Sequence, residues 1–109
     1  SGKMNKDTIF PTDDFRSLWL KGERLESILL RVEQLKRLSK IPIANISRRF
    51  LLQHNYPKKV IFGVKSIKHV DDILKDLDSD PLECDLIEKI ISLCKTDFGL
   101  SESHKNLGY

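Results

Sequence analysis

Residues 60–77 read Val-Ile-Phe-Gly-Val-Lys-Ser-Ile-Lys-His-Val-Asp-Asp-Ile-Leu-Lys-Asp-Leu, a short apolar run followed by a turn and a helical pattern. The apolar run predicts a strand over Lys59–Phe62 that is buried on both faces, as strands of parallel sheets are. No other stretch offers an evident sheet partner, so the backbone groups of this strand stay unpaired. The strand is therefore one piece of a larger sheet or barrel, or a second chain or a changed local structure completes it.

The turn after this strand has the composition of an anion-binding site. Gly63 allows a close backbone approach, and Lys65 supplies a positive charge. Ser66 is the expected N-cap of the next helix, where exposed N–H groups favour anions. The helix is predicted to run through Leu77, and its inward face is expected to consist of Ile67, Val70, Ile73, Leu74 and Leu77.

The other apolar residues recur at helical spacing and predict three more helices, over about 23–39, 42–53 and 80–94. Pro42 opens the second of these, and Asp80-Pro81 supplies an N-cap and a first helical residue for the last. The predicted fold class is mainly α with one short strand, in the order α-α-β-α-α. We assign residues 1–9 to a tag or disordered arm, 10–95 to one domain and 96–109 to a flexible tail.

The composition excludes several classes of protein. A chain of 109 residues forms one domain at most, and its 39% hydrophobic and 32% charged residues suit a helix-rich globule. The net charge of +3 is small and basic residues alternate with acidic ones, so no nucleic-acid partner is expected. The chain has no apolar run near 18 residues and no signal peptide, which predicts no membrane span.

The two cysteines predict neither a disulfide nor a metal site. Cys84 and Cys94 lie ten positions apart in one predicted helix, about 15 Å along its axis, beyond disulfide reach. Neither they nor His54 and His104 have partners at metal-ligand spacing. Reduced thiols favour a cytoplasmic location.

Several segments together carry a family resemblance. Their order and spacing resemble the C-terminal part of the aldo-keto reductases, NADP-dependent barrel enzymes that reduce carbonyl groups. The resemblance extends from about Phe10 to Leu93. The segments are Phe10-Pro-Thr-Asp-Asp-Phe-Arg16 with Gly22-Glu23, Val32-Glu-Gln-Leu-Lys36, Asn45-Ile-Ser-Arg-Arg-Phe-Leu-Leu52, Val60-Ile-Phe-Gly-Val-Lys-Ser66 and Pro81-Leu82.

The resemblance implies a fold and a cofactor. It implies that 59–62 is the last strand of a (β/α)8 (TIM) barrel, of which this chain is an incomplete C-terminal segment. The loop after that strand would grip the adenosine 2′-phosphate and the adenine of NADP, at the strand end where barrels of this kind bind ligands. The cofactor-binding residues that follow from the resemblance are Gly63, Lys65, Ser66, His69 and Asp72.

The chain also departs from the family. The family commonly has Gln or Arg at His69, and a Glu-Asn pair at Asp72-Ile73. Ile73 cannot make the amide contact to adenine, and Asp72 is shorter than Glu. The family's catalytic Asp, Tyr, Lys and His come from the N-terminal half of the barrel, to which nothing here corresponds. This chain alone is therefore not expected to catalyse hydride transfer, whereas its parent is expected to be an NADP-dependent reductase.

The alternative is a noncatalytic protein-interaction or regulatory module with a vestigial nucleotide loop. In either case we expect a homo-oligomer that pairs the Val60–Phe62 strands, or a partner protein segment that covers them. Asp71-Asp72 is expected to stabilise the N-terminal turn of its helix. Arg48-Arg49 together with Lys58-Lys59 is expected to be a solvated face.

Overall fold

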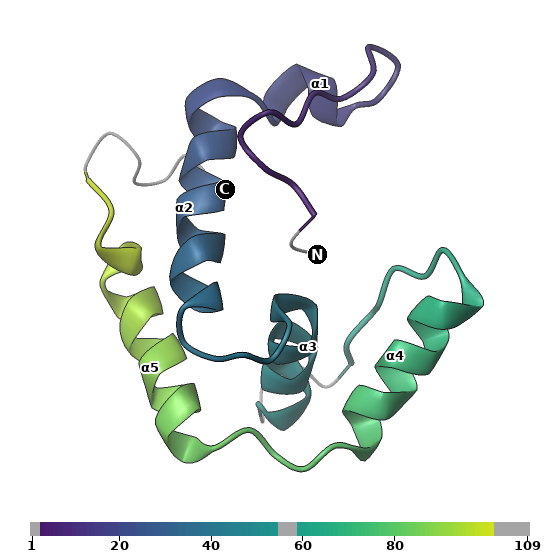
Figure 1. Ribbon diagram of the computed structural model, residues 1–109, viewed down its shortest axis with the longest axis vertical. Coiled ribbons are helices and arrows are strands. Elements are labelled where there is room, and N and C mark those ends of the chain that lie inside the picture. Colours follow the sequence, from purple (N-terminus) through teal and green to yellow (C-terminus); the bar gives the residue numbers. More distant parts are fainter. Residues whose placement is uncertain (1–2, 55–58, 102–109) are drawn as a thin grey trace.

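The computed structural model describes residues 3–54 and 59–101, and within them the chain forms five α-helices and one 3₁₀ turn. In Figure 1, α3 lies between α4 on one side and α2 and α5 on the other. The predicted mainly helical class is confirmed. In the described part, no helix is both long and apolar enough to cross a membrane. The elements are α1 (Arg16–Trp19), α2 (Gly22–Lys36), α3 (Ile43–Gln53), α4 (Ile67–Asp78), α5 (Cys84–Lys95) and η1 (Asp97–Gly99).

The predicted strand over Lys59–Phe62 is absent, which corrects the sequence interpretation. Residues 59–65 have no regular secondary structure, and the side chain of Ile61 is 96% exposed where burial was expected. A strand needs a neighbouring edge for its N–H and C=O groups, and the regular elements of the described chain are all helical. The segment therefore leaves its backbone to solvent, while Phe62 is half-buried.

Hydrogen bonds explain two other differences from the sequence prediction. The last helix begins at Cys84 rather than at Pro81. The N–H of Leu82 donates to the side-chain oxygen of Gln53 at 2.7 Å, so this N–H is already bonded outside the helix. The segment before α2, for which no helix is predicted, contains the short helix α1, where the carboxylate of Asp14 accepts from the N–H of Arg16 at 2.9 Å. Neither contact has a signature in the hydrophobic pattern.

The apolar core is small. Five hydrophobic residues, drawn from α2, α3, α5 and two connecting turns, are almost fully buried, and each stabilises the fold by roughly 1.5–3 kcal/mol. Because so few apolar residues are buried, polar contacts between helices matter more for the stability of the fold. The five are Leu20, Leu25, Ile46, Leu82 and Ile90.

A buried carboxylate joins α3 to α4. The side chain of Asp76 on α4 is only 3% exposed. One of its oxygens accepts from the amide of Asn45 at 2.8 Å, and the other accepts from Nε of Arg48. A buried carboxylate is tolerated only with such partners, so these two hydrogen bonds decide which side of α4 faces α3.

A second polar link joins α2 to the turn after α5. The guanidinium of Arg31 donates to the buried Ser27 and, at 3.0 Å, to the carboxylate of Asp97. Asp97 and Phe98 both have positive φ, 46° and 59°, a conformation that non-glycine residues seldom adopt. The ion pair helps to hold this turn, so residues 97–99 of the predicted flexible tail form an ordered turn, whereas 102–109 lie outside the described residues.

The apolar side of α4 faces solvent, contrary to the sequence prediction. Only Ile73 of the five expected inward residues is half-buried. The reason is that α4 packs on α3 through the side of the helix that carries Asp76, and no further described element covers the adjoining side. The exposed fractions of the four other residues are 81% for Ile67, 40% for Val70, 52% for Leu74 and 54% for Leu77. We call these four the α4 ridge.

Replacing the buried carboxylate tests its role. Asp76→Ala should lower the free energy of unfolding by about 2–3 kcal/mol, because Arg48 and Asn45 lose their acceptor. Asp78→Ala, at an exposed position of the same helix, should change it by less than about 0.5 kcal/mol. Urea unfolding followed by circular dichroism measures both, and equal losses would refute the assigned role.

Candidate functional site

Three of the predicted site residues meet at the start of α4. Ser66 caps the helix, and its hydroxyl oxygen accepts from the N–H of His69 at 3.3 Å. The imidazole Nδ1 of His69 turns back and accepts from the N–H of Lys65 at 3.2 Å. These two hydrogen bonds fix the loop conformation and leave the ammonium of Lys65 at an exposed position.

The first turn of α4 keeps free donors. The N–H groups of Ile67 and Lys68 have no acceptor in the part of the chain that the structure describes. Free N–H groups at a helix N-terminus carry a partial positive charge and suit an oxyanion. Lys65 and Lys68 flank them with two full charges. This end of α4 therefore carries groups that could bind an anion.

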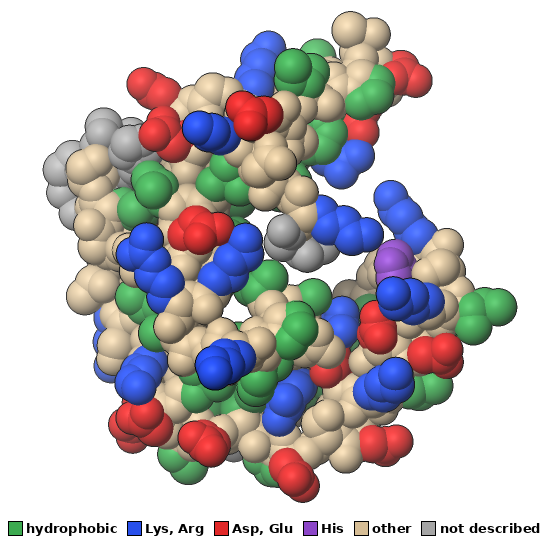
Figure 2. All heavy atoms as spheres, viewed as in Figure 1, with side chains coloured by type: hydrophobic (Ala, Val, Ile, Leu, Met, Phe, Trp, Pro, Cys, Tyr) green, Lys and Arg blue, Asp and Glu red, His purple; other side chains and the backbone are tan. Residues whose placement is uncertain are grey.

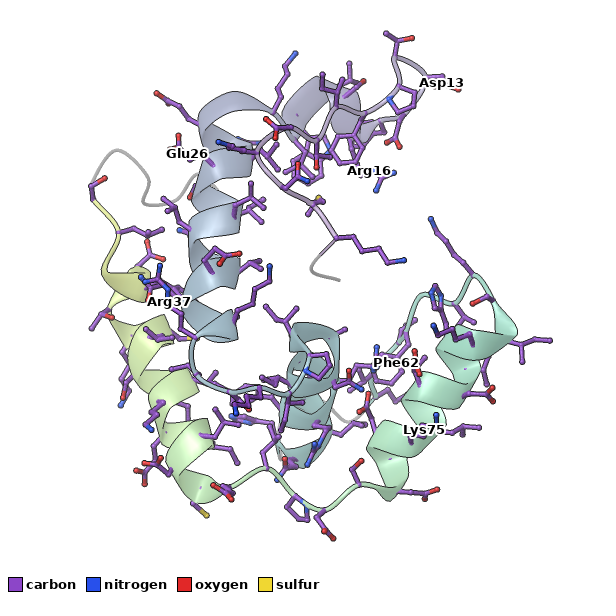
Figure 3. All side chains as sticks on the ribbon, in the orientation of Figure 1. Asp13, Arg16, Glu26, Arg37, Phe62 and Lys75 are labelled. Carbon is purple, nitrogen blue, oxygen red and sulfur yellow. The ribbon has the colours of Figure 1, made fainter. Side chains whose placement is uncertain are left out.

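A cleft of about 590 Å³ lies beside this turn, between α2, α3 and α4. Gly63, His69 and Asp72 line it, together with Ile73, whereas Lys65 and Ser66 lie in the adjoining loop. In Figure 3, Phe62 lies between α3 and α4, at the wall of this cleft. The structure thus gathers the five predicted residues in one region, three in the cleft itself and two at its neighbouring loop.

The cleft has an apolar wall and a cationic rim. Figure 2 shows Lys and Arg side chains gathered around the opening between the N-terminal arm and α4. A lining of this kind suits a ligand with an anionic group and a flat apolar body. The apolar side chains are Val32, Leu35, Ile43, Ala44, Phe62 and Ile73, and the cationic ones are Lys3, Arg48 and Lys68.

The sequence interpretation missed Arg48. It assigned Arg48 and Arg49 to a solvated face, yet the side chain of Arg48 is only 20% exposed and lines the cleft. Its partner Asp76 lies 28 positions along the chain, on another helix. No local sequence pattern connects two residues so far apart, so the Arg48–Asp76 ion pair could not be predicted from the sequence.

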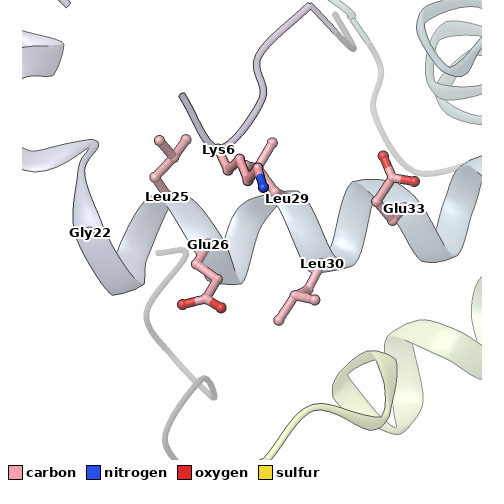
Figure 4. A pocket seen from close by; sticks show the side chains of 7 residues that line it. All are labelled: Lys6, Gly22, Leu25, Glu26, Leu29, Leu30 and Glu33. Carbon is pink, nitrogen blue, oxygen red and sulfur yellow. The ribbon is translucent and has the colours of Figure 1, made fainter. Parts of the chain in front are cut away.

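A second hollow lies on α2 and is a poorer candidate. It measures about 410 Å³, and Figure 4 shows its lining residues spread along α2, with Lys6 beside them on the N-terminal segment. Its rim carries the carboxylates of Glu26 and Glu33 with a single cation, Lys6, so it repels a phosphate. None of the predicted site residues lies there. The remaining lining residues are Gly22, Leu25, Leu29 and Leu30.

The described residues contain no cluster of three or more His, Cys, Asp or Glu side chains that could hold a metal ion. Cys84 and Cys94 are both exposed free thiols on α5, remote in sequence from the α4 loop. The candidate chemistry therefore rests on the cations and N–H groups beside α4.

Comparison with known proteins gives no relative: no protein-family model, no curated protein and no solved structure matches the chain.

One titration tests the electrostatics of this region. The Arg16 guanidinium and backbone N–H bond to Asp14 and lower its pKa from 3.8 to about 2, and the charge of Lys65 adds a smaller effect. Arg16→Ala should therefore raise the pKa of Asp14 toward 3.8, and Lys65→Ala should raise it less. The pKa of Asp14 is measured by following its carboxyl chemical shift by NMR as the pH is changed.

The sign of the pH effect follows from the lowered pKa. Ionised Asp14 contributes to stability above its ordinary pKa of 3.8, and this contribution disappears as the pH falls through about 2. A pKa near 3.8 in the unaltered protein would contradict the Asp14–Arg16 geometry.

Proposed function

We propose that the cleft beside α4 binds the adenosine phosphate of NADP, and that this chain is the C-terminal part of an aldo-keto reductase-like protein. One observation carries the proposal. Residues that the resemblance assigns to the cofactor, Gly63, His69 and Asp72, line a single cleft, and Lys65 and Ser66 shape the loop beside it.

The polar end of the cleft supports a phosphate contact. The ligand's 2′-phosphate would accept from the free N–H groups of Ile67 and Lys68 and pair with the ammonium of Lys65. Charge-assisted hydrogen bonds of this kind are stronger than neutral ones. The Ser66 cap keeps the donors in place, because it fixes the start of the helix.

The apolar end suits an adenine ring. Phe62 in the loop before α4 and Ile73 on α4 line the cleft and offer apolar contact to the faces of a flat ring. Asp72 lines the same cleft and is the acceptor available to an exocyclic amino group. Ile73 has no hydrogen-bonding group for the ring edge, so adenine is held mainly by its faces.

In this proposal the chain supplies the cofactor site and the rest of a barrel supplies the catalytic groups. Two features support a missing neighbour: Ile61 is 96% exposed in the segment expected to be a strand, and the α4 ridge is uncovered. Restored to a barrel, 59–62 would pair with neighbouring strands and become the last βα unit. The reaction of the whole protein would be NADP-dependent carbonyl reduction. The exposed free thiols Cys84 and Cys94 favour a cytoplasmic location.

A second candidate function is a noncatalytic protein-interaction module, which the α4 ridge favours. The residues of the α4 ridge follow one another at intervals of three, four and three, a pattern that is the same in both directions along the chain. Two antiparallel copies related by a twofold axis would therefore place Ile67 opposite Leu77 and Val70 opposite Leu74. On this reading the partner is a second copy of the chain.

A nucleotide titration tests the first candidate. NADP⁺ should bind more tightly than NAD⁺, and Lys65→Ala should weaken NADP⁺ binding about tenfold, because a charged phosphate contact is lost. Lys75→Ala, which removes an exposed lysine from the far end of α4, should leave the affinity unchanged. Calorimetry measures all four. Equal affinity for NAD⁺ and NADP⁺, or no binding of either, would contradict the proposal.

Sedimentation over a wide concentration range tests the second candidate. The unaltered chain should form dimers, and Leu74→Glu should abolish them by placing a charge in the middle of the contact. Leu51→Glu is the matched control, since Leu51 on α3 is 42% exposed and lies outside the ridge. A monomer at every concentration, or equal effects of the two substitutions, would rule out self-association through α4.

A further inference from the structure

We propose that Arg48 is a second anion contact in the cleft, so that the ligand carries two phosphate groups. The inference rests on the proposed nucleotide site and extends it from one phosphate to two. It assigns a binding role to a residue of α3, on the wall of the cleft that α4 does not form.

The orientation of Arg48 supports this role. Its Nε donates to one oxygen of the buried Asp76, whose other oxygen accepts from Asn45. In the described part of the chain, the terminal Nη groups of Arg48 have no hydrogen-bond acceptor, and Arg48 lines the cleft.

A guanidinium held in this way is a preorganised phosphate receptor. Its two terminal nitrogens present parallel N–H donors, a geometry that matches two oxygens of a phosphate. Because Asp76 fixes the side chain, little rotamer entropy remains to be lost when a ligand binds. The pairing with Asp76 also explains how a largely buried cation is tolerated beside an apolar wall.

The cleft therefore offers two separate anion contacts from two elements. The first is the turn of α4 with Lys65 and Lys68, and the second is Arg48 on α3. A nucleoside monophosphate can occupy one of them. A nucleoside bisphosphate, with phosphates on both sides of its ribose, can occupy both while its base contacts Phe62. The ligand class that fits is a bisphosphorylated nucleoside or a larger nucleotide containing one.

Calorimetry with three simple nucleotides tests the inference. Adenosine 2′,5′-bisphosphate should bind at least about tenfold more tightly than adenosine 2′-phosphate or adenosine 5′-phosphate. Arg48→Lys should reduce this advantage below about threefold and leave the 2′-phosphate affinity within about twofold. A lysine keeps a cation beside Asp76, but its one ammonium cannot also supply the paired donors. Arg49→Lys, next to it on α3 and outside the cleft lining, should preserve the advantage.

The outcomes separate this inference from the proposed function. If adenosine 2′-phosphate binds and the bisphosphate has no advantage, the nucleotide site stands and the role of Arg48 is overturned. If Arg48→Lys and Arg49→Lys act alike, that role is also overturned. If none of the three nucleotides nor NADP⁺ binds, both proposals fail. If Arg48→Lys does not fold, the comparison of the bisphosphate with the two monophosphates on the unaltered chain still tests whether the cleft has two phosphate contacts.

Discussion

The hydrogen bonds that Asn45 and Arg48 donate to the buried carboxylate of Asp76 determine the rest of this structure. The apolar core is small, so a polar contact with both oxygens satisfied can set the rotation of α4 about its own axis. That rotation places His69, Asp72 and Ile73 at the cleft and leaves the α4 ridge outside. Both candidate functions therefore depend on one buried carboxylate.

The two sides of α4 suit different kinds of binding partner. The cleft side already combines cations, free N–H groups and an apolar wall, so a small anionic ligand can complete it. The ridge side has apolar groups alone, which gain free energy only when another macromolecule removes them from water. The two candidate functions are compatible, because a chain that binds a nucleotide on one side of α4 can bind a protein on the other side.

The sequence predicted those features that depend on neighbouring residues. The amphipathic helices and the Ser66 cap follow from local spacing and chemistry. It failed where distant residues decide the outcome. The strand over 59–62 needed an edge that the described chain does not offer, the start of α5 depends on Gln53, and the orientation of α4 depends on Arg48. None of these pairings leaves a trace in a hydrophobic pattern.

The most direct measurement of the central claim is the mapping of ligand-induced changes on the backbone amides by two-dimensional NMR. On addition of NADP⁺, the account predicts that the amides of residues 65–69 shift first and furthest, and that NAD⁺ shifts them much less because it lacks the 2′-phosphate. Shifts confined to other helices, or equal shifts with both nucleotides, would contradict a phosphate site at the start of α4.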